Sequence, residues 1–233
     1  MTAGVYCRDI ESYLCRRNGG HLIRIVGPAF DLVCGWEAQR IPLSVVYRAI
    51  DQKVERRAAA RAWQRPVRIE FCKQDVQELF DAWRRAVGVS GADREDAAAA
   101  PRPGRGPSLP AHLERVILAL TALRAHLAHP AALRNLAERL AAELDSARAA
   151  ARTARGAQRA RLLARLSAAD SELLAAARAA TEAPLRDRLR REAELELAGF
   201  RERMPPAAFN KAVEAGADRL LREQLELPRI AFD

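Results

Sequence analysis

Two stripes of apolar residues at helical spacing, with a short break between them, constrain the fold of this chain most. One stripe lies in residues 28–40 and the other in residues 42–57, and the break falls at Arg40, Ile41 and Pro42. Both segments begin with a proline, which the first turn of a helix tolerates well. The pattern therefore predicts two helices joined by a tight turn. The residues expected to face the core are Phe30, Val33, Cys34 and Trp36 in the first helix and Val45, Val46, Ala49, Ile50 and Val54 in the second.

The residues around the break form a more specific pattern. Residues 36–50 read WEAQRIPLSVVYRAI, with a small residue in the first helix, a short turn, and a Val-Tyr-Arg run that opens the second helix. This stretch resembles the helix-turn-helix of bacterial transcription and replication proteins, although Arg40 stands where such turns usually carry Gly. The resemblance covers residues 28–57 only, and it implies binding to double-stranded DNA. The side chains that it places at base edges in the major groove are Ser44, Tyr47, Arg48 and Gln52. Those that it places at the phosphates are Arg40, Arg56, Arg57 and Arg61.

A second interpretation of the helix pair involves no nucleic acid. Two amphipathic helices joined by a turn that contains proline also occur in small helical domains of other kinds. Asp51 and Glu55 lie on the second helix, where their charges would oppose a groove lined by phosphates. The alternative is therefore a non-catalytic helical adaptor or scaffold protein. Replacing Arg48 and Gln52 by Ala would abolish DNA binding under the first interpretation and change nothing under the second.

The charge balance supports a polyanionic partner only in part. The chain has a formal net charge of +9 and a pI near 10.2, which suits nucleic acid or an anionic membrane surface. Of its 39 basic residues only Lys53, Lys73 and Lys211 are lysines, and Arg in an Ala-rich chain is typical of a GC-rich genome. Arg abundance alone therefore does not indicate phosphate binding. Residues 1–87 hold 15 basic and 10 acidic side chains and residues 111–233 hold 21 and 17, so the N-terminal part is the more basic per residue.

Further elements are predicted on either side of the helix pair. Residues 9–18 have helical spacing and end before two glycines, which predicts a short first helix. Residues 22–26 and 67–71 alternate and are rich in β-branched residues, so we expect a two-stranded β element beside the helices, as in a winged helix-turn-helix. Residues 73–87 predict a helix that closes an N-terminal domain of residues 1–87.

The composition changes after this domain. Residues 88–110 contain several Pro and Gly residues and no apolar periodicity, which predicts a flexible linker. Residues 111–233 carry apolar stripes at helical spacing, so we expect a helical bundle, resembling a coiled coil, that binds a partner protein or forms a homodimer. The chain is 49% apolar but only 5% aromatic, and much of the apolar content is Ala. The predicted fold class is therefore mainly α.

Two segments of the second half have more than one interpretation. Basic residues recur from Arg148 to Arg165 at spacings that an unbroken helix would align, and such a stripe either contacts phosphates or forms a solvated face. The apolar segment 225–230 either packs back on the bundle or binds a partner.

No pattern in the sequence predicts catalysis, a metal or a cofactor. Cys7, Cys15, Cys34 and Cys72 form no CxxC pair and have no nearby His, so we expect reduced structural thiols. His126 and His129 are followed at once by a proline and have no carboxylate in register, which argues against a metal site. The chain begins with no signal-peptide pattern and has no apolar run long enough to span a bilayer, so a cytoplasmic location is expected.

Overall fold

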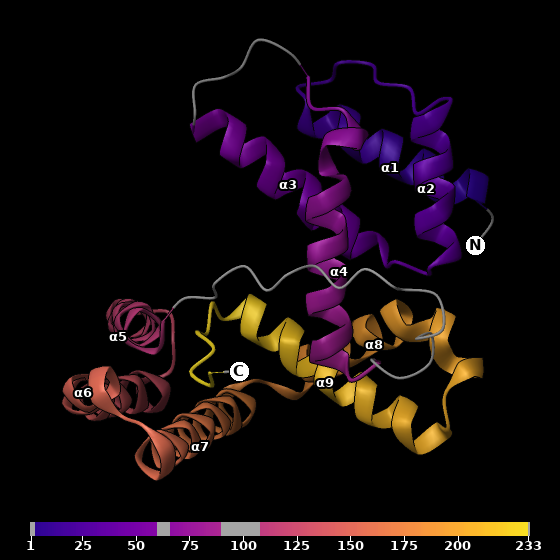
Figure 1. Ribbon diagram of the computed structural model, residues 1–233. Coiled ribbons are helices and arrows are strands. Elements are labelled where there is room, and N and C mark those ends of the chain that lie inside the picture. The colour runs from indigo at the N-terminus through magenta and orange to yellow at the C-terminus, as the bar shows by residue number, and fades with distance from the viewer. Residues whose placement is uncertain (1–2, 60–65, 90–107, 233) are drawn as a thin grey trace. The chain divides into compact units, whose positions relative to one another are not determined.

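The computed structural model describes residues 3–59, 66–89 and 108–232 (Figure 1). In this part of the chain every regular element is helical, with nine α-helices and two 3₁₀ helices. The prediction of a mainly α fold is confirmed. The chain divides into two compact units, one made of Met1–Asp93 and Ala193–Ala215 and the other of Arg94–Glu192 and Gly216–Asp233. The predicted division into residues 1–87, a linker at 88–110 and residues 111–233 stays a prediction.

The first unit is built on three helices with a fourth packed against them. α1 packs on both α2 and α3, and α4 packs on α3 and on the 3₁₀ helix η1. Helix α4 has the bounds expected from the sequence, and Gly88 ends it in the left-handed conformation at φ 73°. The elements are α1 (Ala3–Arg17), α2 (Pro28–Ala38), α3 (Leu43–Ala59), η1 (Ile69–Cys72) and α4 (Lys73–Val87). Their buried side chains include Ile10, Leu14, Val33, Trp36, Val46, Ile50, Val76 and Phe80.

The predicted two-stranded β element is wrong, because the described parts of both segments contain no strand. Residues 22–26 form no regular element, and side chains of α1 accept from two of their amides. The amide of Ile25 donates to Glu11 Oε1 at 2.6 Å, and the amide of Ile23 donates to Cys15 Sγ at 3.2 Å. A helix surface therefore takes the place that the partner strand was expected to fill.

The second expected strand, residues 67–71, is held in the same way. Asn18, which is 2% exposed, accepts from the amide of Val67 at 2.7 Å and donates to its carbonyl at 3.1 Å. The chain then turns into η1. In a strand, Phe71 would share the buried face of Val67, but Phe71 is 52% exposed and Cys72 is fully buried instead. Ile69 and Cys72, the buried residues of η1, are three residues apart, which is the spacing of a 3₁₀ helix and not the alternation of a strand.

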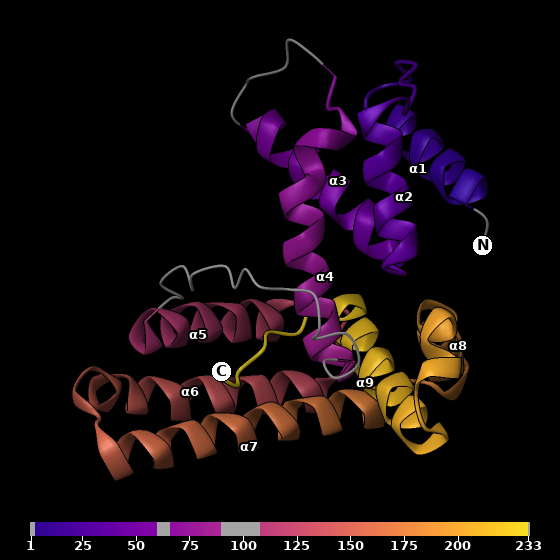
Figure 2. The same cartoon turned by 45° about the vertical axis from the view of Figure 1, so that its right-hand side comes forward.

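The second unit contains three long helices in a row. α5 (Leu109–Ala125) packs on α6 (Ala131–Thr153), which packs on α7 (Gly156–Ala180), and Figure 2 shows the three side by side. The expected apolar stripes face this interior. Leu127 follows the end of α5 and is 81% exposed. The fully buried leucines of the stripes are Leu113, Leu120, Leu133, Leu140, Leu166 and Leu173.

The remaining elements are α8 (Ala183–Leu197), η2 (Ala198–Arg203) and α9 (Pro206–Gln224). Two of the boundaries between the units fall inside α8 and α9. Of the predicted linker, residues 90–107 lie outside the described residues. Leu109 and Pro110 form the first turn of α5, and the Ser108 side chain caps this helix by accepting from the amide of Ala111. None of the helices in the described residues combines the length and the apolar character needed to cross a membrane.

Candidate functional site

The turn between α2 and α3 is tight although it has no glycine. Arg40 takes the left-handed conformation at φ 57°. Its amide donates to the backbone carbonyl of Glu37 at 2.8 Å, and the amide of Ile41 donates to the backbone carbonyl of Trp36 at 3.0 Å. These two bonds form the pattern of a Schellman motif. Ile41 is buried, and Tyr6 donates to its carbonyl at 2.9 Å. These bonds hold a residue other than Gly in a conformation that costs it about 1–2 kcal/mol.

The four predicted base-reading residues have different surroundings. The Tyr47 ring stacks on Tyr13 of α1, with the ring centroids 4.0 Å apart and the planes 11° from parallel. Burial raises the pKa of Tyr47 above its ordinary value, and the nearby charge of Asp9 raises it further. Arg48 is exposed and Gln52 is half-buried.

Ser44, the remaining member of this set, is bound by a carboxylate that lies 152 residues further along the chain. Its hydroxyl donates to Glu196 Oε1 at 2.7 Å, and the indole of Trp83 donates to Oε2 of the same carboxylate at 3.1 Å. Trp83 also packs on Phe200, with ring centroids 5.7 Å apart. The Ser44 hydroxyl at the start of α3 is therefore bound within the protein, although Ser44 itself is exposed.

The acidic residues of α3 are paired with α1. Asp51 lies 2.6 Å from the Arg17 guanidinium, and Glu55 lies 3.9 Å from it. Tyr13 donates to the Asp51 carboxylate, with its hydroxyl 2.9 and 2.8 Å from the two oxygens. Burial, followed by this hydrogen bond, raises the pKa of Tyr13 to about 12. The charge of Asp51 is thus compensated within the protein, whereas the exposed Glu55 only approaches the same guanidinium.

The predicted phosphate-contacting residues also have neighbours in the protein. Arg40 is exposed and lies over Gly199, where an added β-carbon would be 3.1 Å from Arg40 Cδ. Arg56 forms an ion pair with Asp75. The Arg57 guanidinium lies over the ring of Phe71, 5.4 Å from its centroid. Arg61 lies outside the described residues. The described members of the predicted site lie on α3 and the turn before it, and whether they bind DNA stays a prediction.

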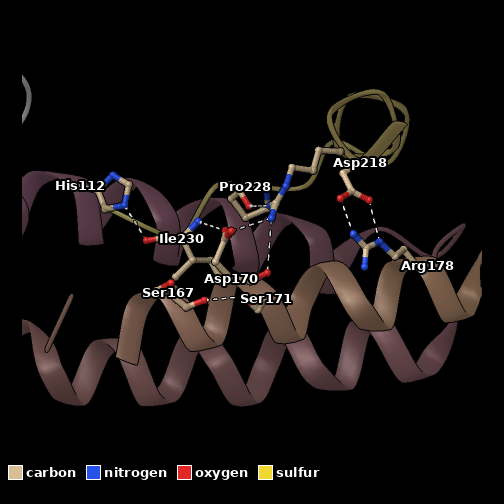
Figure 3. A network of polar contacts seen from close by, with 9 residues as sticks. His112, Ser167, Asp170, Ser171, Arg178, Asp218, Pro228 and Ile230 are labelled. Atoms are coloured by element: carbon tan, nitrogen blue, oxygen red, sulfur yellow. Dashed lines mark hydrogen bonds and ion pairs between the residues drawn. The ribbon is translucent and has the colours of Figure 1, made fainter. Parts of the chain in front are cut away.

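A second candidate site, which the sequence did not predict, lies in the second unit and holds residues 225–232, named here the tail segment. Ile230 is fully buried, and both of its backbone polar groups are bound by side chains. Its amide donates to Asp170 Oδ1 on α7 at 2.7 Å, and its carbonyl accepts from His112 Nε2 on α5 at 3.0 Å. Figure 3 shows the two side chains reaching Ile230 from different helices. The surface between α5 and α7 that holds the tail segment is named the tail groove.

Other contacts extend the tail groove on both sides of Ile230. Arg222 of α9 donates to Asp170 Oδ2 at 2.7 Å and to the carbonyl of Pro228 at 3.1 Å. The side chains of Asp170 and Arg222 are only 16% and 17% exposed, so water screens this pair weakly. Phe232 meets the edge of the His112 ring, with centroids 5.2 Å apart, and the Arg159 guanidinium lies 5.8 Å from its centroid.

The sequence carried partial signals of this site. The apolar segment 225–230 was expected either to dock or to bind a partner, and the structure shows it docked. The expected basic stripe is interrupted, because α6 ends at Thr153 and α7 begins at Gly156. Arg159 contacts Phe232 in the tail segment, and Arg148 forms an ion pair with Asp145 at 3.7 Å.

The described residues contain no group of His, Cys, Asp or Glu side chains that could hold a metal ion. The rings of His126 and His129 lie 4.8 Å apart, and burial together with the charge of His126 lowers the pKa of His129. The four cysteines are free thiols.

No protein-family model matches the chain, and neither a curated protein nor a solved structure matches it.

Proposed function

We propose that this protein is a non-catalytic adaptor whose helical bundle binds extended apolar peptide segments in the tail groove. One observation carries the proposal: the groove binds residue 230 by its backbone as well as by its side chain. Hydrogen bonds to the main chain of a peptide contribute affinity, and pockets for alternate side chains contribute specificity. The Asp170 carboxylate and the His112 ring supply the hydrogen bonds to the main chain, and the full burial of Ile230 supplies the pocket for a side chain.

The surroundings of α3 favour the same function. Ser44 and Tyr47 are half of the predicted base-reading set, and both are bound by side chains of the first unit. Reading bases with them requires that these contacts break. In this proposal α3 serves mainly as a packing element, and binding to other molecules falls to the bundle.

A labelled peptide with the sequence of residues 225–232 tests the proposal by fluorescence anisotropy. The full chain carrying Ile230→Lys is the receptor, because a charged side chain at this buried position releases the tail segment and leaves the groove open. We expect this variant to bind the peptide about tenfold or more tightly than the wild type, in which the linked tail segment competes. Circular dichroism checks that the variant keeps its helices.

Two matched controls complete this experiment. A peptide with Lys at the position of Ile230 should not bind, and adding Asp170→Ala to the receptor should weaken binding of the original peptide. Absence of binding to a folded Ile230→Lys variant would rule out the proposal.

DNA binding through α2 and α3 is a second candidate function. It is supported by the tight turn at Arg40 and by the pairing of Asp51 and Glu55 with Arg17, which lowers the repulsion from a phosphate-lined groove. The net charge of +9 points the same way.

Anisotropy with a labelled DNA duplex at low salt tests this second function. Binding that weakens steeply with added salt is expected, as is a collapse of binding when Arg48 and Gln52 are replaced by Ala. Arg24→Ala is the control, since it removes one exposed charge from the loop before α2. A chain that shows no affinity for duplex DNA at low salt excludes this function without affecting the adaptor proposal.

A further inference from the structure

The tail segment begins with a turn that a non-glycine residue makes unfavourable. α9 ends at Gln224, and Glu226 then takes the left-handed conformation at φ 51°. The amide of Leu227 donates to the backbone carbonyl of Arg222 at 2.9 Å. The end of α9 therefore has the same type of hydrogen bond as the end of α2 at Arg40. Among the described residues, Arg40 and Glu226 are the only non-glycine residues with positive φ. A residue with a β-carbon is disfavoured there, so the closed turn carries a conformational cost that the burial of Leu227 offsets.

The contacts beyond this turn do not require that the tail segment and the groove belong to one chain. Ile230 is bound by His112 and Asp170, which lie 118 and 60 residues away in the sequence. Phe232 packs on His112 and faces Arg159. A second copy of the chain presents the same groove, so its side chains would meet an incoming tail segment with the same contacts.

We propose that the tail groove accepts the tail segment of a second copy, so that two chains exchange residues 225–232 and form a dimer. This inference rests on the proposed function, since it assigns the partner of the same groove. Within one chain the tail segment competes at an effective concentration on the order of millimolar. Exchange is therefore favoured when the protein is concentrated, or when the turn at Glu226 opens. Because only the turn changes conformation, the bundle itself stays as it is in the monomer.

Two substitutions at one position test the exchange in opposite directions. Glu226→Gly removes the β-carbon and relaxes the closed turn, whereas Glu226→Val places a β-branched residue in a conformation that it strongly avoids. The measurement is the molar mass by size-exclusion chromatography with light scattering over a series of protein concentrations. We expect the Val variant to dimerise with a dissociation constant about tenfold or more below that of the Gly variant.

A second substitution shows whether the dimer uses the tail segment. Adding Ile230→Lys to Glu226→Val should return the protein to a monomer, because the exchanged segment loses its buried anchor. A dimer that persists in this double variant overturns the proposal, as does a folded Glu226→Val variant that stays monomeric over the whole concentration series.

The comparison of wild type with Glu226→Gly decides the question if the Val variant does not fold. The dimer fraction of concentrated wild-type protein should exceed that of the Gly variant, and equal fractions overturn the exchange. The failure of the adaptor proposal has a different signature, because there the labelled peptide does not bind the Ile230→Lys variant at all. If the peptide binds but substitutions at position 226 do not change the dimer fraction, the adaptor proposal holds and only the proposed exchange is excluded.

Discussion

Replacing Asp170 by Ala should release the tail segment from its groove. The Asp170 carboxylate accepts from the amide of Ile230 and from the guanidinium of Arg222, each at 2.7 Å. Hydrogen bonds to a charged group contribute about 1.5–3 kcal/mol each. Only the bond to Ile230 holds the tail segment directly, so we assign about 2 kcal/mol of its docking free energy to this carboxylate. Since about 1.4 kcal/mol corresponds to a tenfold change in an equilibrium constant, the open state should become about 30-fold more populated.

Hydrogen exchange at the amide of Ile230, followed by NMR, measures this change. The exchange rate of an amide that opens locally reports the free energy of that opening, so the Asp170→Ala variant should exchange it about 30-fold faster. Amides of α5 and α6 in the same sample should keep their wild-type rates, because the three-helix interior does not involve Asp170.

Asp218→Ala is the matched control for this experiment. Asp218 on α9 accepts from Arg178 on α7, with Nε and Oδ1 2.7 Å apart, and Figure 3 shows the pair close to the tail segment. The substitution therefore removes a second Asp–Arg pair between the same two helices without removing any bond to the tail segment. The reasoning is refuted if Ile230 exchanges at the wild-type rate in Asp170→Ala, or if both variants accelerate it equally.

Three further predictions concern the first unit. Asn18→Ala should lower the free energy of unfolding by about 2–4 kcal/mol, because it leaves the buried amide and carbonyl of Val67 unpaired. Urea denaturation followed by tryptophan fluorescence measures this, and a loss below about 1 kcal/mol contradicts it. Arg40→Gly should raise the free energy of unfolding by about 0.5–1 kcal/mol, because Gly adopts the left-handed conformation without strain. A lower urea midpoint would show that the lost contact of Arg40 with Gly199 costs more than the relieved conformation contributes. Because the pKa of Tyr13 is raised from 10.0 to about 12, its contribution to stability is fully present below pH 10.0 and is lost as the pH rises through about 12. Tyr13→Phe should remove this contribution of Tyr13 from a titration of the free energy of unfolding against pH. If the loss of stability at high pH is unchanged in the variant, another group causes it.

The left-handed residues at the two helix ends show how far local rules reach. Gly at the end of a helix indicates the stop directly, and Gly88 after α4 is such a case. Arg40 and Glu226 make the same kind of turn without this signal. In both turns the residue after the left-handed one is apolar and buried, namely Ile41 and Leu227. Burial of this next residue stabilises the turn in place of the conformational freedom of Gly.

Local sequence patterns predicted most of the helices, although α1 begins at Ala3 and not near residue 9 as expected. Helical hydrogen bonds join residues four apart, so apolar spacing and the positions of Pro and Gly indicate where helices form. The stripes that bury Leu113 and Leu140 and the bounds of α4 follow from this local information. The same rules failed for residues 67–71, because the backbone of Val67 is bound by the side chain of Asn18, directly after α1, and no local pattern indicates this contact.

The side chains that form the candidate sites could not be predicted from the sequence, because helix packing brings them together. Ser44 meets Glu196 across 152 residues of sequence, and His112 meets Ile230 across 118. Such pairs depend on how whole helices pack, and the spacing of residues within one helix carries no information about the neighbour that will cover it. The face of α3 that resembles a recognition helix and the groove that holds the tail segment were therefore distinguishable only after the helices were assembled.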